Sequence, residues 1–371
     1  MGVTRAETPS PISNAALNRA TLARQMLLAR EKTTVSKAVA RLVALQAQLP
    51  RPPFIGLWTR VAGFRREDLT NALADRTVVR GTSLRGTLHL MTAADYVAFR
   101  GAIQPSLEAG LSVVRGRVNL TDLDAALALG REHFKKGPTP FEPLRDAIRK
   151  RFPKADERAM AYAVRLYVPL LQVPGEAVWG FEPSCDFTMA ELWLKKPVSI
   201  EHARAHDLVK RYLAAYGPAA PADAQTFLGL KGLREVFEEL RPKLVTFQDE
   251  KKRELFDLPD APRPSASTPA PVRLLPEFDS LVLGHADRER IVAKEHTSKI
   301  TTKNLQVAAI FLVDGMAAGT WKVEGTKKAP KMTITPWGKL SKSARKDVDD
   351  EAGRLLEWIK EQDQDQKPST T

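Results

Sequence analysis

The sequence has little cysteine and no long apolar run, and both shortages narrow the class of protein. Its single cysteine, Cys185, excludes an intrachain disulfide and is typical of a protein that works in a reducing cytosol. No uninterrupted apolar run reaches the length that crosses a membrane. Residues 1–14 also lack the apolar core of a signal peptide. The sequence therefore predicts a cytoplasmic protein with no membrane partner.

The common catalytic signatures are missing as well. The chain contains no GxSxG, P-loop, GxGxxG or HExxH motif. His202 and His206 stand four residues apart, a spacing that can hold zinc, but no third ligand is evident. A solvated helix face is the far more frequent reason for such a pair. The sequence implies no metal and no organic cofactor.

Acidic residues are scarce in two parts of a basic chain, whose net charge is +13 and whose pI is about 9.8. Residues 1–91 hold 14 Lys and Arg against five Asp and Glu, and residues 325–346 hold seven basic residues and no acidic one. Residues 200–258 are balanced, at ten of each. Lys and Arg side chains bind nucleic acid by releasing phosphate counterions, so the charge favours DNA as a partner. The alternative is a chain that is merely Arg-rich.

Short helices followed by a two-stranded hairpin are predicted three times along the chain. In the first set, Thr34 is placed to cap a helix, prolines open a helix near residue 52, and Arg66–Ala74 is helical. The three hairpins span residues 77–92, with a turn at Arg85-Gly86, residues 170–181, with a Pro-Gly turn, and residues 243–258. The order is typical of tandem winged helices, although the residues themselves do not repeat.

The predicted fold is α+β and mainly α, with three tandem winged-helix domains before a C-terminal β-rich, barrel-like domain that ends in a helix. A Pro/Ser/Ala-rich stretch separates the two parts and is predicted to be a linker. The predicted boundaries are a disordered lead at 1–16, winged helices at 17–92, 93–198 and 199–258, the linker at 259–272, the β domain at 273–360 and a disordered tail at 361–371.

Two neutral amides, Gln46 and Gln48, flank Ala47 where an apolar run meets a proline cluster. Pro50 disfavours helix at Leu49, so we expect a helix to end at or near residues 46–48. On a continuing helix the two amides point apart, whereas in an extended segment they share a face and can address one water molecule. Glutamine does not titrate, so it orients water without acting as a general base. That is enough for a cationic, N7-alkylated purine, which leaves easily, and inadequate for an undamaged base.

Four stretches carry a resemblance to a known family: LQAQLPRPPFIGLWTR, LRGTLHLMTAADY, RYLAAYGPAAPADAQTFLGL and LLPEFDSLVLGHADRERI. In this order, over roughly residues 17–325, they resemble the bacterial AlkZ-type DNA glycosylases. Those are tandem winged-helix proteins with a Gln-apolar-Gln or Gln-apolar-Asp catalytic motif, and they excise N7-alkylpurines; some unhook interstrand crosslinks. The resemblance implies that Gln46 and Gln48 are catalytic. It also implies a minor-groove hairpin, for which the candidate here is residues 289–310, with a Lys/Thr-rich tip that matches no crosslink-unhooking member.

The predicted DNA contacts come from the basic N-terminal quarter, the hairpin tip and the lysine-rich segment. Arg85 and His89 match a family pattern, yet Arg85 is equally suited to anchor the hairpin turn, and for His89 we favour a buried, hydrogen-bonded imidazole. The predicted DNA-binding residues are Arg51, Arg60, Arg80, Arg85, His296, Lys299, Lys303, Lys327 and Lys328.

The functional prediction is a monofunctional DNA glycosylase that hydrolyses the N-glycosidic bond of N7-alkylated purines, including bulky or crosslinked ones, in duplex DNA. We expect a monomer, associated with the nucleoid, whose phosphate contacts carry no sequence information. One alternative is a winged-helix DNA-binding regulator without catalysis. The other is a protein-interaction scaffold whose charge is incidental.

Overall fold

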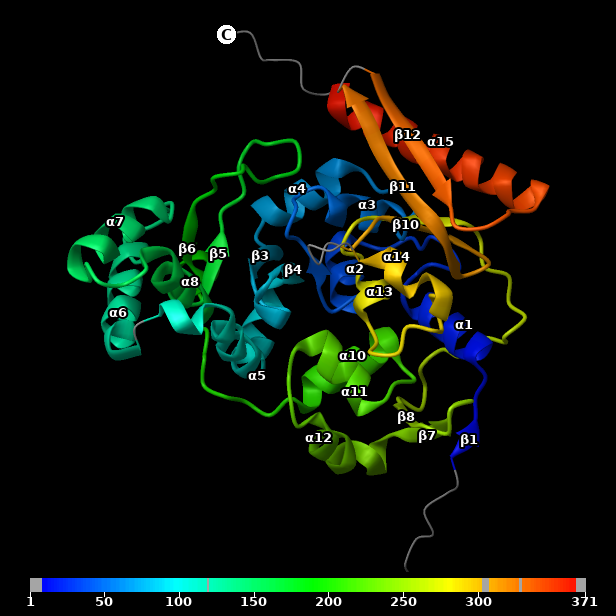
Figure 1. Cartoon of the computed structure of the whole chain (residues 1–371), viewed down its shortest axis with the longest axis horizontal. Coiled ribbons are helices and arrows are strands. Elements are labelled where there is room, and N and C mark those ends of the chain that lie inside the picture. The colour runs from blue at the N-terminus through cyan, green and yellow to red at the C-terminus, as the bar shows by residue number, and fades with distance from the viewer. Residues whose placement is uncertain (1–8, 119, 302–306, 327–328, 365–371) are drawn as a thin grey trace, which may run out of the picture.

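The computed structural model describes residues 9–118, 120–301, 307–326 and 329–364 of an α+β chain (Figure 1). Its β structure forms three separate sheets, with helices packed around them. Within these described ranges, no helix combines the length and apolar character needed to cross a membrane.

The central five-stranded sheet has the strand order β2-β4-β3-β5-β6, and every neighbouring pair is antiparallel. Its first hairpin is confirmed: β3 and β4 turn through Arg85 and Gly86, whose φ angles of 57° and 71° are both left-handed. The strands are β2 (Leu45–Gln46), β3 (Val78–Thr82), β4 (Leu88–Thr92), β5 (Leu170–Gln172) and β6 (Phe187–Met189).

Local signals place the first helices well. Thr34 caps α2 by accepting a hydrogen bond from Lys37 N, as predicted, and prolines occupy the first turn of α3. The first helix ends at Arg24, because the chain leaves helical geometry at Met26, whose φ is 57°. These helices are α1 (Asn14–Arg24), α2 (Val35–Arg41), α3 (Pro52–Trp58) and α4 (Arg66–Ala74).

The second predicted hairpin, at residues 170–181, is wrong in its second strand. Strand β5 pairs with β6, with Leu171 opposite Thr188, and residues 173–186 form a long loop between them. The Pro-Gly turn lies inside this loop, where Gly175 N donates to Gly180 O. The surrounding helices are α5 (Ala93–Gly110), α6 (Leu123–Phe134), α7 (Glu142–Arg151), α8 (Glu157–Tyr167) and α9 (Ala190–Leu194), with 3-10 turns at Leu111–Arg117 and Leu120–Asp122.

The third hairpin is confirmed and belongs to a second sheet. Strands β7 (Val245–Gln248) and β8 (Glu254–Asp257) are antiparallel, and β1 (Ser10–Pro11) adds to β7 in parallel. The helices before it are α10 (His206–Tyr216), α11 (Pro221–Leu228) and α12 (Leu233–Leu240). Helices thus precede a ribbon as expected, but the first two ribbons share one sheet. The division into three winged helices stays a prediction.

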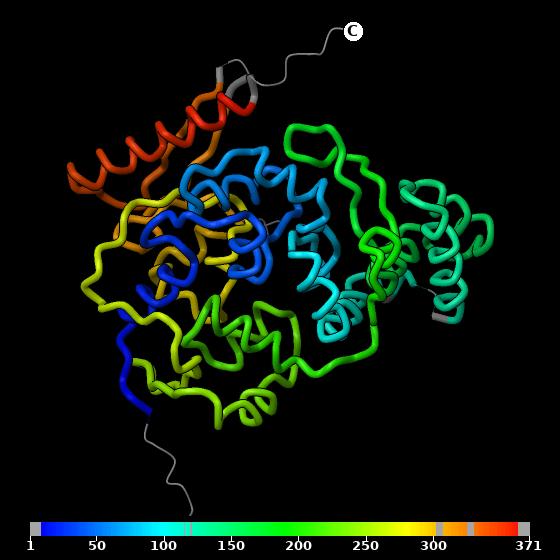
Figure 2. Tube along the Cα trace, turned by 180° about the vertical axis from the view of Figure 1, so that it is seen from behind, coloured from blue at the N-terminus to red at the C-terminus, as the bar shows by residue number. Residues whose placement is uncertain are grey.

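The C-terminal sheet is open and not a closed barrel, with the strand order β12-β11-β10-β9 and β9 and β12 at its edges. Helix α15 and the N-terminal helices bury its face, so the sheet does not need to close (Figures 1 and 2). Its elements are β9 (Arg273–Leu275), α13 (Ser280–Leu283), α14 (Thr297–Ile300), β10 (Ile310–Val313), β11 (Met316–Thr326), β12 (Ala329–Pro336) and α15 (Lys342–Gln364).

In the described part of residues 289–310, the predicted hairpin is reduced to one antiparallel bridge between Thr301 and Val307. Residues 294–300 are helical, as a 3-10 turn followed by α14, and residues 302–306 lie outside the described residues. The long ribbon of this region is β11–β12. Both of its strands lie within residues 273–360, which the sequence predicted to be β-rich.

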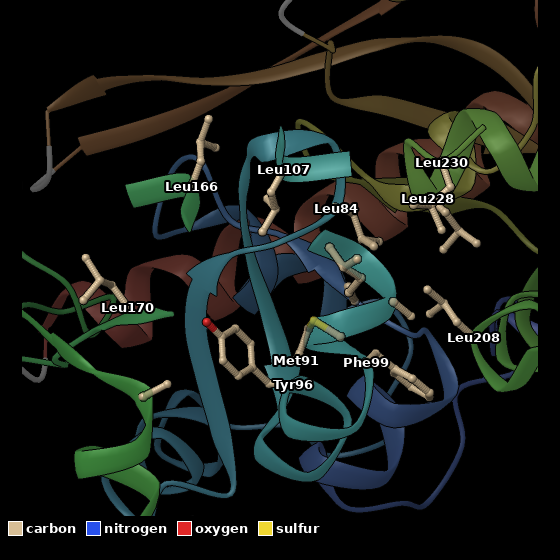
Figure 3. Packing of buried hydrophobic residues seen from close by; sticks show 14 of the residues in the cluster. Leu84, Met91, Tyr96, Phe99, Leu107, Leu166, Leu170, Leu208, Leu228 and Leu230 are labelled. Carbon is tan, nitrogen blue, oxygen red and sulfur yellow. The ribbon is translucent and has the colours of Figure 1, made fainter. Parts of the chain in front are cut away.

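Distant parts of the chain share their cores. Phe54 and Leu57 of α3 pack in one cluster with Phe311 of β10 and with Leu355 and Trp358 of α15. A larger cluster under the central sheet joins the first hairpin to α5, α8 and α10, and part of it is drawn in Figure 3. The central sheet therefore rests on a rigid base, and β2, at its edge, carries the first glutamine of interest.

Candidate active site

Gln46 ends the short strand β2 at the edge of the central sheet, and Gln48 lies two residues later, in a bend. The helix before them, α2, ends at Arg41, and Val43 turns the chain with a φ of 68°. Ser280 Oγ then holds Ala44 O at 3.1 Å. A helix ending at residues 46–48 is therefore wrong, and the extended alternative is confirmed for β2, which includes Gln46.

Hydrogen bonds from β3 and β4 fix the motif formed by residues 46–48, called the QAQ motif below. Ala47 N donates to Leu88 O at 2.7 Å, and Leu88 N donates to Gln48 Oε1 at 2.9 Å. From the opposite side, Arg80 Nε and Nη2 donate to Ala47 O at 3.0 and 2.6 Å. The Gln48 side chain thus takes the place of a backbone carbonyl as the acceptor for Leu88 N, where the chain turns away towards Pro50. Backbone and side chain of the QAQ motif are thus held together.

Arg85 and His89 hold the first glutamine. Arg85 Nη2 donates to Gln46 Oε1 at 3.1 Å, and Nη1 donates to Phe227 O. His89 lies opposite Gln46 in the sheet; its Nδ1 is 3.0 Å from Thr87 O and its Nε2 is 3.4 Å from Arg85 Nη2. This arrangement fits a neutral imidazole that carries its proton on Nδ1.

Burial sets the charge states at the motif. It lowers the pKa of His89 to about 3, and the neighbouring Arg85 cation adds to the effect, so this ring is neutral at pH 7. Burial also lowers the pKa of Arg80 and of Arg85 to about 10, so both remain cations at neutral pH. In the described part of the chain, both donate only to neutral oxygens. The site therefore keeps a positive charge.

The amides themselves remain accessible. Gln46 is half-buried, while Gln48 and Leu49 are exposed. Each amide oxygen has a second lone pair beside the one used by Arg85 or Leu88, and each NH₂ group is a donor. A cleft of about 700 Å³ opens beside Gln48. Two amides that are fixed by hydrogen bonds and reachable by solvent can orient a water molecule without removing its proton.

The structure gives the other predicted DNA contacts different roles. Arg60 is wrong as a phosphate contact, because its fully buried guanidinium forms a two-pronged ion pair with Asp279, at 2.8 Å for each bond. Arg80 is only 4% exposed and holds Ala47 O, so it too is wrong as a surface contact. Arg85 anchors the turn and Gln46, and His89 is the buried, hydrogen-bonded imidazole that was the favoured alternative.

The remaining predicted contacts lie apart from the motif or outside the described residues. Arg51 is half-buried, with its guanidinium 5.8 Å from the Trp179 ring centre. His296 packs against Trp337 with 5.0 Å between ring centres, and the exposed Lys299 lies 5.8 Å from the same ring. DNA contact by these three stays a prediction. Lys303, Lys327 and Lys328 lie outside the described residues.

Sequence reasoning missed the residues that line the cleft beside Gln48. Arg158, Ala161, Tyr162 and Arg165 of α8 all face it. Their spacing of three, four and seven residues places them on one helix face, and this stripe was the available signal. For a metal, the described residues offer no cluster of three or more His, Cys, Asp or Glu side chains.

Comparisons with known proteins agree with one another. The sequence model of the family described as "DNA glycosylase AlkZ-like" matches residues 39–358. An "Interstrand DNA cross-link repair glycosylase" of Streptomyces sahachiroi is 25% identical over 354 residues, which cover 90% of this chain and 92% of that protein. The solved structure of Streptomyces sahachiroi DNA glycosylase AlkZ superimposes with a TM-score of 0.79 at 21% identity, covering 94% of this chain and 97% of that chain. The last comparison shows a shared fold.

Proposed function

The chain belongs to the AlkZ-like DNA glycosylase family and is a DNA glycosylase, and we propose that it releases N7-alkylated purines from duplex DNA with water positioned by Gln46 and Gln48. The observation that carries the proposal is the QAQ motif, whose two amides are held by hydrogen bonds beside two arginines that no carboxylate of the described residues neutralises. The named activity of the S. sahachiroi relative supports including interstrand crosslinks among the substrates.

The proposed reaction needs few groups from the protein. The water oxygen forms a bond to C1′ of the damaged nucleotide while the C1′–N9 bond breaks. The electron pair of that bond moves into the purine, which changes from a cation to a neutral leaving base, and the water proton passes to solvent. The amides hold the water and accept its O–H, while Arg85 polarises the Gln46 amide through Oε1. No lysine nucleophile takes part, so the product is an intact strand with an abasic site.

The positive charge at the motif has two roles in this proposal. Arg80 does not contact phosphate directly, but neither Arg80 nor Arg85 is neutralised by a carboxylate in the described residues, so both add to the positive potential around the motif. They also raise the energy of a cationic purine relative to the neutral base that departs. Only the second role favours an alkylated purine over a normal one, because the alkylated ring loses its charge on leaving.

The test uses duplex DNA with one N7-methylguanine, followed by alkali to cleave abasic sites. We expect strand breaks with the parent protein and none with the double variant Gln46→Ala, Gln48→Ala. The matched control is Gln248→Ala on β7, where only the backbone is hydrogen-bonded to β1 and β8, and it should retain full activity. Unchanged cleavage by the double variant would refute the water-positioning role. A parent that binds DNA but releases no base from methylated or crosslinked duplexes would favour the regulator.

A further inference from the structure

The cleft beside Gln48 is built from elements that the catalytic motif does not use. It lies between the 173–186 loop and helices α7 and α8, and its volume of about 700 Å³ is within the range of about 300–1,000 Å³ that small-molecule sites have. Gln48 and Leu88 line it and are also hydrogen-bonded to each other in the motif. A ligand in this cleft is therefore in contact with the catalytic amide.

Aromatic rings form much of the wall. Phe141 packs edge-on against Phe187 with 4.7 Å between ring centres, and Phe181 lies 4.5 Å from the Arg80 guanidinium. Tyr162 of α8 completes the apolar surface. Flat aromatic walls favour a flat ligand, and every nucleobase has two such faces.

The charges around the cleft favour an anion. Arg145 forms an ion pair with Glu142 at 2.8 Å, while Arg158 is exposed at the edge. Burial lowers the pKa of Arg80 to about 10, so Arg80 remains a cation at neutral pH, and burial also lowers the pKa of Arg165. The charged lining residues are Arg80, Arg145, Arg158, Arg165, Glu142 and Glu182. The excess of two positive charges suits a phosphate group.

One polar group in the wall lacks a partner. Gln172 is 8% exposed; its Nε2 donates to Cys185 Sγ at 2.7 Å, and its Oε1 has no hydrogen-bond partner among the described residues. A buried acceptor without a donor is costly. Purines carry ring N–H and amino groups that can supply a donor.

We propose that this cleft is a nucleotide subsite, which takes one unstacked purine nucleotide of the DNA with its base against Tyr162 and its phosphate at Arg158. The inference rests on the proposed function, because contact with Gln48 identifies this nucleotide as the one whose glycosidic bond faces the motif. A damaged base leaves the stack more easily than an intact one, so the subsite selects for damage. The subsite therefore serves purine monoadducts small enough to enter the cleft, and crosslinked purines, which are tied to both strands, do not use it.

Binding of a free nucleotide tests the subsite without any chemistry. The probe is 2-aminopurine deoxyriboside 5′-monophosphate, whose fluorescence falls when its base stacks on an aromatic ring. We expect saturable quenching by the intact protein with a dissociation constant of about 1 mM or lower, weakened about tenfold for the nucleoside without phosphate. Arg158→Glu should weaken nucleotide binding at least about tenfold, and Tyr162→Leu should abolish the quenching.

The matched control is Arg149→Glu, since Arg149 is an exposed arginine on α7 that does not line the cleft. It should bind like the parent. Absence of saturable binding, or equal binding by all variants, overturns the subsite. The methylguanine assay separates the two proposals: base release without nucleotide binding refutes only the subsite, whereas nucleotide binding without base release refutes only the proposed function.

Discussion

Arginines of the N-terminal helices and arginines at the QAQ motif have different partners. Arg24 donates to both carboxylate oxygens of Asp257, at 2.7 and 2.8 Å, and Arg60 does the same with Asp279. Arg80 and Arg85 donate instead to backbone and amide oxygens. In the first group each charge is cancelled inside the protein, while in the second no carboxylate of the described residues cancels it.

The excess of positive charge in residues 1–91 does not all face solvent. Several of its cations are paired with acids far along the chain, such as Arg30 with Glu351 and Arg19 with Asp314. They tie the N-terminal helices to the C-terminal sheet and are not a DNA-facing surface. Many of the basic residues in this region therefore stabilise the tertiary structure. The cations that remain available to DNA are fewer and lie closer to the motif.

The largest effect should follow from breaking a carboxylate pair. Asp279→Ala leaves the Arg60 cation buried without its partner, so we expect the free energy of unfolding to fall by about 3–5 kcal/mol in urea titrations. The matched control is Asp314→Ala, because its carboxylate is 74% exposed in the pair with Arg19; its cost should stay below about 1 kcal/mol. Equal costs for the two variants would remove the distinction between structural and surface arginines.

The buried His89 imidazole should make the folded protein less stable in acid. The folded-state pKa of His89, about 3, lies below the unfolded value of about 6.5. As the pH falls below about 6.5 the unfolded chain takes up a proton that the folded chain does not, so stability is fully present above that pH and declines towards pH 3. Between pH 7.5 and 5.0 this histidine should cost about 2 kcal/mol.

The variant His89→Asn measures that contribution. Its loss of unfolding free energy over the same pH interval should be smaller than the parent's by about 2 kcal/mol. His285, whose pKa is also lowered by burial but which lies away from the motif, provides the comparison through His285→Asn. If His89→Asn keeps the full pH dependence of the parent, the imidazole titrates normally and is not buried as described.

Arg80→Met sharpens the comparison at the motif. Removing both donors to Ala47 O should lower kcat about 10- to 100-fold, because the glutamines lose their fixed position. KM should change little, because no phosphate contact is lost. Arg80→Lys keeps the charge and one donor and should recover part of kcat. A rise in KM at constant kcat would instead support the phosphate contact that the sequence predicted.

The smallest effects should come from exposed lysines of the C-terminal ribbon region. Lys331 and Lys339 are exposed, so replacing either with Ala should weaken DNA binding equally for all sequences. Each lost phosphate contact should reduce the slope of log K against log salt by about 0.9. Fluorescence anisotropy at several salt concentrations measures the slope. Slopes that do not change would place DNA on another face.

Predictions that rest on short local patterns, such as helix caps and turns, are confirmed. Thr34 was expected to cap a helix and does, and the turn at Arg85-Gly86 joins β3 to β4 as predicted. The hairpin at 170–181 was misplaced, because the partner of β5 is β6, which follows a loop of residues 173–186, and residues 289–310 contain only the antiparallel bridge between Thr301 and Val307 in their described part. Pairing over such distances depends on the packing of side chains from elsewhere, which no short window contains.

The sequence by itself determined the basic charge, the helical segments around residues 35–74, and the Gln-Ala-Gln motif together with its family resemblance. Only the tertiary structure decided that Gln46 ends a short strand, that Arg80 and Arg85 hold the motif, and that Arg60 is internal. The physical reason is that a guanidinium has the same composition whether it faces water, a carboxylate or a carbonyl oxygen. Its role follows from the partner that folding brings to it from a distant part of the chain.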